Sequence, residues 1–169
     1  EQIIITSRDY PYPSASYLKI SGGIYQDCII HDIDSVCWIL NELPYKVFSS
    51  SSKTVNEEIS AGNLDNVTTI LTFGSGIMVT LISSRIANSY DQRIEILNNN
   101  GIFSIKNPNI EHSISFDERY ADSYKNELEH LYDIIKNRKD CKISYNDCYN
   151  AYTICEYASK SNKSNKEEI

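Results

Sequence analysis

The sequence has no excess of positive charge, since 16 Lys and Arg residues stand against 23 Asp and Glu residues and the net charge is −7. A surface that binds nucleic-acid phosphates needs a cationic excess, so this balance argues against a nucleic-acid partner. Long apolar runs are also missing: no segment approaches the roughly 18 residues of a membrane span, and no signal peptide is visible. We therefore expect a soluble, cytoplasmic protein that has neither a nucleic-acid nor a membrane partner.

Closely spaced cysteine pairs are absent as well. The cysteines form an odd set of five without a Cys-x-x-Cys motif. This pattern argues against disulfides and against a zinc site, and we expect no metal. Cys148 and Cys155 are interpreted as small buried hydrophobes on a helix.

A chain of 169 residues with 41% hydrophobic side chains can bury one good core but is too short for two full domains. We expect a single domain over residues 1–159. The segment 160–169, rich in Ser, Asn, Lys and Glu, is expected to be a polar, flexible tail. The chain begins at Glu1 without a methionine and opens directly into a strand-like run, 2–6, which indicates a piece of a longer protein.

Hydrophobic periodicity predicts strands, helices and hairpins in a definite order. The predicted elements are strand 2–6, helix 27–40, strands 45–50, 67–73, 77–84, 93–97 and 101–105, and helices 119–137 and 145–159. The first helix should bury Ile30, Ile33, Cys37 and Leu40, and the polar stretches 49–53 and 56–63 should be exposed loop. This order predicts an α+β fold: an open, mostly antiparallel β-sheet with helices on one face.

One stretch, 21–40, joins a double glycine, a helix and a plausible acid/base pair. Helical spacing puts Asp27, His31 and Asp34 along one side of the helix. Two interpretations stay open. Asp27 either caps the helix and satisfies a partly buried His31, or it orients His31 so that the imidazole moves a proton on a bound substrate.

Four further side chains are candidates for ligand contact. Arg8 and Asp9 lie ahead of the double glycine, where they either reach a small polar ligand or form a plain surface ion pair. Tyr90 lies between the two predicted hairpins and is either a surface aromatic or a ligand contact. Tyr124 belongs to an aromatic stripe on the helix 119–137, which favours a core position as much as a functional one.

Four ordered motifs resemble the catalytic domain of the Gfo/Idh/MocA oxidoreductases and, within that family, the inositol 2-dehydrogenases. They cover residues 5–11 with 17–34, residues 89–97, residues 100–102 and residues 118–128. The likeness runs in order along the chain, with strand and helix patterns in register. The resemblance implies hydride transfer between a secondary alcohol of a cyclitol or sugar and a nicotinamide cofactor, NAD or NADP.

The resemblance also implies roles for single residues. His31 and Asp27 would be catalytic, with His31 as the base that takes the hydroxyl proton. Arg8, Asp9, Tyr90 and Tyr124 would contact the polyol substrate.

Two features of such enzymes are missing from these residues. Neither a Gly-x-Gly-x-x-Gly after a strand nor a Glu-Lys-Pro motif occurs, so the cofactor-binding Rossmann domain is expected to be absent from this chain. The part that is present would bind substrate and form a homo-oligomer, a dimer or tetramer, through the open sheet face. The alternative is a stand-alone, non-catalytic sugar-binding or oligomerisation module.

Overall fold

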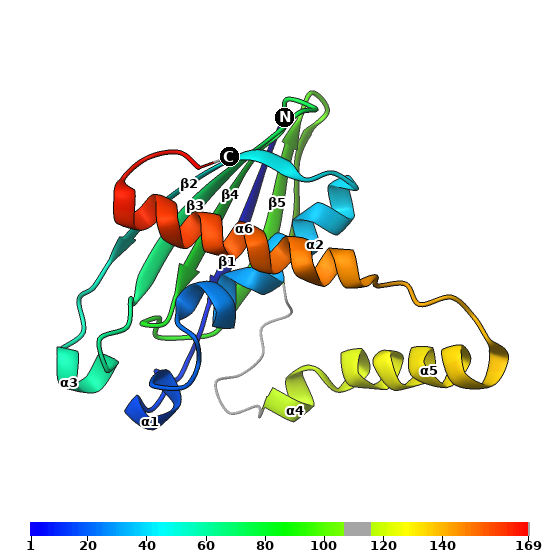
Figure 1. Cartoon of the computed structure of the whole chain (residues 1–169), viewed down its shortest axis with the longest axis horizontal. Helices are drawn as coiled ribbons and strands as arrows, with labels where there is room; N and C mark the ends of the chain where they lie inside the picture. The colour runs from blue at the N-terminus through cyan, green and yellow to red at the C-terminus, as the bar shows by residue number, and fades with distance from the viewer. Residues whose placement is uncertain (107–115, 169) are drawn as a thin grey trace.

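The computed structural model describes residues 1–106 and 116–168. Within them, one six-stranded sheet has the order β2-β3-β4-β1-β5-β6 (Figure 1). The strands are β1 (Gln2–Arg8), β2 (Pro44–Ser52), β3 (Asn66–Phe73), β4 (Met78–Ser84), β5 (Asp91–Asn98) and β6 (Gly101–Lys106). Only β1 and β4 pair in parallel, and the other neighbours are antiparallel, so the predicted mostly antiparallel sheet is confirmed.

The helices are α1 (Ala15–Leu18), η1 (Tyr25–Ile29), α2 (Ile30–Leu40), α3 (Glu57–Ser60), α4 (Phe116–Arg119), α5 (Ala121–Asn137) and α6 (Tyr145–Ser164). In Figure 1, α2 and α6 lie across the same face of the sheet, while α5 extends away from it. The predicted α+β class with helices on one face is therefore confirmed. Among the described residues, none of the helices has the length and apolar character that crossing a membrane requires.

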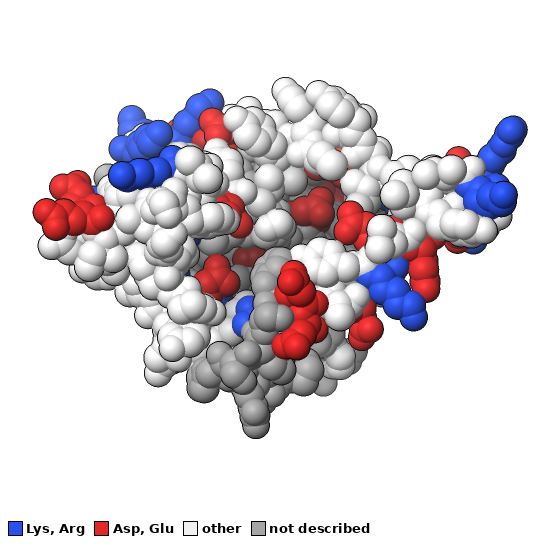
Figure 2. Space-filling view, turned by 90° about the horizontal axis from the view of Figure 1, so that it is seen from below, with Lys and Arg blue, Asp and Glu red and all other residues white. Residues whose placement is uncertain are grey.

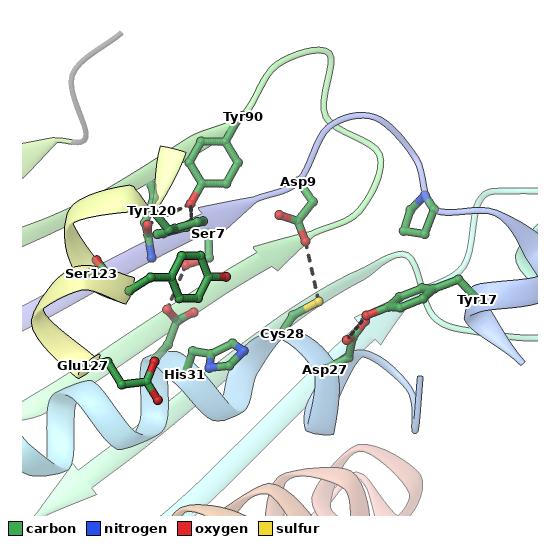
Figure 3. Close-up of a pocket in the computed structure, with 14 residues that line it drawn as sticks. Ser7, Asp9, Tyr17, Asp27, Cys28, His31, Tyr90, Tyr120, Ser123 and Glu127 are labelled. Atoms are coloured by element: carbon green, nitrogen blue, oxygen red, sulfur yellow. Dashed lines mark hydrogen bonds between the residues drawn. The ribbon is translucent and has the colours of Figure 1, made fainter. Parts of the chain in front are cut away.

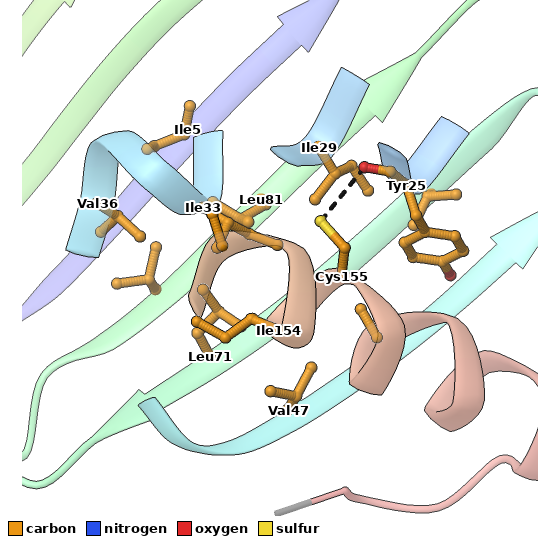
Figure 4. Close-up of a cluster of buried hydrophobic side chains, with 14 of the residues drawn as sticks. Ile5, Tyr25, Ile29, Ile33, Val36, Val47, Leu71, Leu81, Ile154 and Cys155 are labelled. Carbon is orange, nitrogen blue, oxygen red and sulfur yellow. Dashed lines mark hydrogen bonds between the residues drawn. The ribbon is translucent and has the colours of Figure 1, made fainter. Parts of the chain in front are cut away.

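The core lies between this sheet face and the helices α2 and α6. Alternate strand residues such as Ile5, Leu71 and Leu81 meet Ile33 of α2 and Cys155 of α6 (Figure 4). All five are nearly or fully buried. Period-two burial in the strands and helical spacing in α2 thus bring together side chains that are far apart in sequence.

The buried stripe of the first helix is displaced from the prediction. Ile29, Ile33 and Val36 are fully buried, whereas Ile30 and Cys37 are only partly buried. The turn η1 before α2 is π-helical, and in it the Ile30 N–H donates to the carbonyl of Tyr25, five residues earlier. This wider turn takes one more residue than an α-helical turn and changes the phase of the sequence pattern.

The chain end is more ordered than its composition indicated. Helix α6 continues to Ser164, and the hydroxyl of the buried Ser161 accepts a hydrogen bond from the Ser49 N–H at 3.0 Å. Glu168 and Val47 exchange backbone hydrogen bonds of 2.9 Å each. The predicted helix end at Ser159 and the predicted frayed tail from 160 are therefore wrong for residues 160–168, because strand β2 supplies partners for these polar groups.

The stretches predicted to be exposed loop are also partly regular. Strand β2 runs to Ser52, and residues 57–60 form the short helix α3, whose first turn is capped by the Asn56 side chain. Ser49 and Ser60 are fully buried. The serine-rich composition did not indicate these elements, although the hydroxyl of Ser49 is hydrogen-bonded to Tyr25 and Thr69 inside the fold.

The sheet face opposite the helices carries apolar side chains on adjoining strands. Register places Phe48 opposite Ile70, Ile70 opposite Thr80, and Thr80 opposite Ile4. Phe48, Ile70 and Ile4 are each only partly buried. This face therefore has an apolar row that the folded chain leaves partly exposed.

Candidate active site

An open cavity of about 500 Å³ lies beside the C-terminal end of β1. Its walls come from the end of β1, the segment before and including α1, the η1–α2 segment, the start of β5 and one side of α5. Figure 2 shows acidic side chains in and around a hollow on the face seen from below. The predicted site residues Asp9, Asp27, His31, Tyr90 and Tyr124 all line this cavity.

Arg8 is the predicted site residue that does not line the cavity. Its Nη1 donates to Asp91 Oδ2 at 2.9 Å, and it follows Ser7 and precedes Asp9, which both line the cavity. Successive residues of a strand point to opposite faces, so Arg8 lies on the other side of the sheet. Arg8 therefore forms an ion pair with Asp91 and not with the neighbouring Asp9, and its contact with a substrate stays a prediction.

Asp27 has partners that the sequence pattern did not identify. Its Oδ1 accepts a hydrogen bond from the Tyr17 hydroxyl at 2.6 Å, and its Oδ2 forms an ion pair with Nη2 of Arg85. The Arg85 side chain is fully buried, whereas that of Asp27 is 18% exposed. Asp27 is therefore paired with a buried cation, and the predicted pairing with His31 is replaced by this contact.

Arg85 could not be found from sequence spacing. It follows directly after β4 and lies 58 residues from Asp27, so only the parallel pairing of β4 with β1 brings it beneath the cavity. The π-helical turn has a local role, since it carries Asp27 and Cys28 on the cavity side. Such turns occur frequently at functional sites.

His31 lies in the first turn of α2, lines the cavity and is exposed. Figure 3 shows its ring at the floor of the cavity, apart from Asp27. An imidazole can exchange a proton near neutral pH, and here it is accessible to a ligand. The interpretation of His31 as a partly buried imidazole satisfied by Asp27 is therefore wrong, because His31 is exposed and Asp27 has Tyr17 and Arg85 as partners.

Asp9 and Cys28 form a second pair of interacting side chains in the cavity. The thiol Sγ of Cys28 lies 3.8 Å from Oδ2 of Asp9. Burial raises the pKa of the Asp9 carboxyl, and the nearby Arg85 charge opposes that rise. Burial likewise raises the pKa of Cys28 to about 12, so this sulfur stays a thiol that can donate to Asp9 and is not a nucleophile at neutral pH.

Asp32 is a cavity residue that the sequence analysis missed. It is 3% exposed, and its Oδ1 accepts a hydrogen bond from the Ser7 hydroxyl at 2.8 Å. Burial raises its pKa to about 6, against the opposing effect of the Ser7 hydrogen bond. The helical spacing drew attention to Asp34 instead, although Asp34 is exposed and does not line the cavity.

Tyr90 and helix α5 complete the opposite wall. The Tyr90 hydroxyl donates to Gln92 Oε1 at 2.8 Å and is hydrogen-bonded to the Tyr120 hydroxyl, while the Arg119 guanidinium lies 3.8 Å from the centre of the Tyr90 ring. Burial, followed by the bond to Tyr120, raises the pKa of Tyr90. Tyr120 is a second cavity residue that was not among the predicted site residues.

The predicted core stripe on α5 is not buried in this chain. Tyr124 is 40% exposed, Leu128 66%, Leu131 49% and Ile135 72%. Tyr124 instead borders the cavity, together with Ser123 and Glu127. For residues 1–106 and 116–168, no group of His, Cys, Asp or Glu side chains is arranged to hold a metal ion.

The sequence and the fold were compared with known proteins. The GFO/IDH/MocA C-terminal domain family matches residues 4–104. A myo-inositol 2-dehydrogenase of Thermotoga maritima is 34% identical over 98% of this chain and 54% of its own length. A protein of Bacillus subtilis named scyllo-inositol 2-dehydrogenase (NAD(+)) is 28% identical over 79% of this chain and 43% of its own length.

A solved structure agrees with these matches. The crystal structure of a probable dehydrogenase from Thermotoga maritima superposes with a TM-score of 0.89 at 33% identity, covering 99% of this chain and 56% of that one. This chain thus spans about half the length of the relatives it matches. The family match, the sheet and the cavity together show that the chain belongs to the GFO/IDH/MocA family of oxidoreductases and corresponds to its C-terminal domain.

Proposed function

We propose that this chain is the substrate-binding and oligomerisation part of an NAD-dependent dehydrogenase that oxidises a CH–OH group of a cyclitol, inositol above all. The observation that carries the proposal is the accessible His31 in an acidic cavity, on a fold shared with inositol dehydrogenases. A polyol offers hydroxyl donors on every side, and the cavity supplies carboxyl, phenol and imidazole acceptors to receive them.

His31 is the proton acceptor of this reaction. When a hydride leaves the carbon of an alcohol, the O–H proton must leave too, and the His31 imidazole takes it at the cavity floor. Asp27 holds one substrate hydroxyl, while Arg85 and Tyr17 fix the position of its carboxylate. The bound nicotinamide supplies the hydride acceptor.

The dinucleotide needs a binding surface outside the described residues. The Gly74-Ser75-Gly76 segment lies between β3 and β4, where Gly76 donates to the carbonyl of Phe73 at 3.0 Å in a strand-to-strand turn. A dinucleotide-binding loop instead joins a strand to a helix and presents N–H groups to phosphate. We therefore assign cofactor binding to a Rossmann domain preceding this one, with NAD favoured over NADP by the printed name of the Bacillus subtilis relative.

The open sheet face is the proposed oligomer interface. Ile4, Phe48 and Ile70 form an apolar row there that is partly exposed. A symmetric pairing of this face with a second copy would bury the row. The cytoplasmic location stays a prediction.

The test is inositol-dependent NADH formation by the full-length protein and by its His31→Ala variant. Loss of a general base lowers turnover by about 100-fold or more. His130→Ala is the matched control, because His130 lies on α5 outside the cavity, where its Nε2 accepts a hydrogen bond from the Lys142 N–H. Unchanged turnover in His31→Ala would refute the assignment. Inositol binding without any NADH formation would instead support a non-catalytic module.

A further inference from the structure

The N-terminal part of helix α5 forms, with Tyr90, one wall of the cavity. Tyr120 just before the helix and Ser123, Tyr124 and Glu127 within it follow the spacing of one helix side, and all of them line the cavity. Figure 3 shows the Glu127 carboxylate directed into the cavity, across from the His31 ring. Glu127 thus faces the same space as His31 but comes from an element far away in sequence.

Each of the other carboxyl groups of the cavity has at least one partner within the chain, although Oδ2 of the buried Asp32 has none in the described residues. Asp27 uses one oxygen for Tyr17 and the other for Arg85. Asp32 is buried and accepts from Ser7, and Asp9 accepts from Cys28. Their capacity to take up further hydroxyl donors is therefore reduced.

Glu127 differs from these three groups. It is exposed, and the described part of the chain gives it neither a hydrogen bond nor an ion pair. Both of its oxygens can therefore accept hydrogen bonds from a ligand that enters the cavity. Hydrogen bonds to an ionised carboxylate are about twice as strong as neutral ones, and two neighbouring hydroxyls can share one carboxylate.

We propose that Glu127 is a substrate-contacting residue that accepts hydrogen bonds from polyol hydroxyls on the side away from the carbon oxidised at His31. The inference rests on the proposed function and deepens it, because it names a residue that discriminates among cyclitols. A site built to hold a particular hydroxyl strongly disfavours an analogue that lacks it, since the carboxylate is then left without its partner.

The experiment measures KM and kcat of the full-length protein with myo-inositol and with monodeoxy-inositols. In Glu127→Ala, KM for myo-inositol rises about 10- to 100-fold, as expected for the loss of charge-assisted hydrogen bonds, while kcat at saturation changes less than about 3-fold. The KM of Glu127→Gln should lie between those of wild type and Glu127→Ala, because the amide side chain keeps one neutral acceptor. At least one monodeoxy-inositol should show the same KM in wild type and Glu127→Ala.

Glu129 provides the matched control. It lies on the same helix, its Oε1 is 3.9 Å from Nζ of Lys125, and it does not line the cavity. Glu129→Ala leaves KM and kcat unchanged. Both glutamates are exposed, so loss of folding does not obscure the comparison.

Three results overturn the inference. If the KM of Glu127→Ala stays within about 2-fold of wild type, Glu127 does not contact the substrate. The proposed function still stands in that case if His31→Ala is inactive. A fall in kcat with a displaced acid limb of the pH profile means that Glu127 acts through His31 and not on the substrate. A wild-type protein that neither binds nor oxidises myo-inositol overturns the proposed function together with the inference.

Discussion

The ion pair between Asp27 and Arg85 allows a test of the site's architecture through stability. Arg85 is fully buried, Asp27 supplies its anionic partner, and two other guanidinium nitrogens of Arg85 have no hydrogen-bond acceptor in the described residues. The exchange Asp27→Asn keeps the size of the side chain and its acceptor for Tyr17. It removes the charge that compensates the buried guanidinium.

The expected loss follows from the burial of the two groups. Breaking a buried pair by removing one partner costs about 3 to 5 kcal/mol. Because Asp27 is 18% exposed, we expect the lower end of that range, about 3 kcal/mol, which lowers the melting temperature of a domain of this size by about 6 to 12 °C. Thermal and urea unfolding followed by circular dichroism measure both quantities.

Two companion variants make the measurement specific. Asp34→Asn changes an exposed carboxylate on α2 outside the cavity and should alter stability by less than about 0.5 kcal/mol. Asp27→Asn combined with Arg85→Met should recover part of the loss, because the double variant buries no unpaired charge. If Asp27→Asn alone costs less than about 1 kcal/mol, the guanidinium is not dependent on Asp27 and the reasoning fails.

Two further predictions concern the buried acids and thiols. Burial raises the pKa of Asp32 to about 6, so the folded state holds this proton more tightly than the unfolded chain, and stability should fall as the pH rises from about 4 to about 6, by on the order of 3 kcal/mol. Asp32→Asn should lack this fall in unfolding experiments across that range, and identical pH profiles would contradict it. Burial raises the pKa of Cys28 and of Cys155 to about 12, so iodoacetamide at pH 8 should modify the exposed Cys141 and Cys148 first, as peptide mass spectrometry can show. Equal labelling of Cys28 and Cys141 would contradict this assignment.

Much of the fold could be predicted because strands and helices repeat with different periods. Residues 67–73 and 77–84 show a period-two pattern on either side of a glycine-rich turn, and the structure pairs them as β3 and β4 with alternating burial. The short helices α1 and α3 were not predicted, since they have only four residues each and leave no periodic signal. Hydrogen bonds between residues distant in sequence were not predicted either, such as the one between Ser161 and Ser49 at the chain end.

The residues of the site likewise include some that the sequence could indicate and some that it could not. Local spacing and the family motifs identified Asp27, His31 and Asp9, because these residues lie on one strand end and one helix start. Arg85, which follows β4, pairs with the cavity residue Asp27, and Glu127 lines the cavity from α5, and the tertiary fold brings both to the site. No periodicity within one element indicates Arg85, whereas Glu127 lies three residues after Tyr124 on the same side of α5 and could have been found from that spacing.

The π-helical turn from Tyr25 to Ile29 sets the position of Asp27 separately from the hydrophobic contacts of α2. An α-helix advances by about 100° for each residue, so a deletion that made this turn ordinary would swing Asp27 away from Arg85 while α2 kept its hydrophobic contacts. A homologue that lost a single amino acid here could therefore keep the scaffold and give up the reaction. Length conservation across this short segment, more than overall identity, would mark relatives that share the activity proposed for this chain.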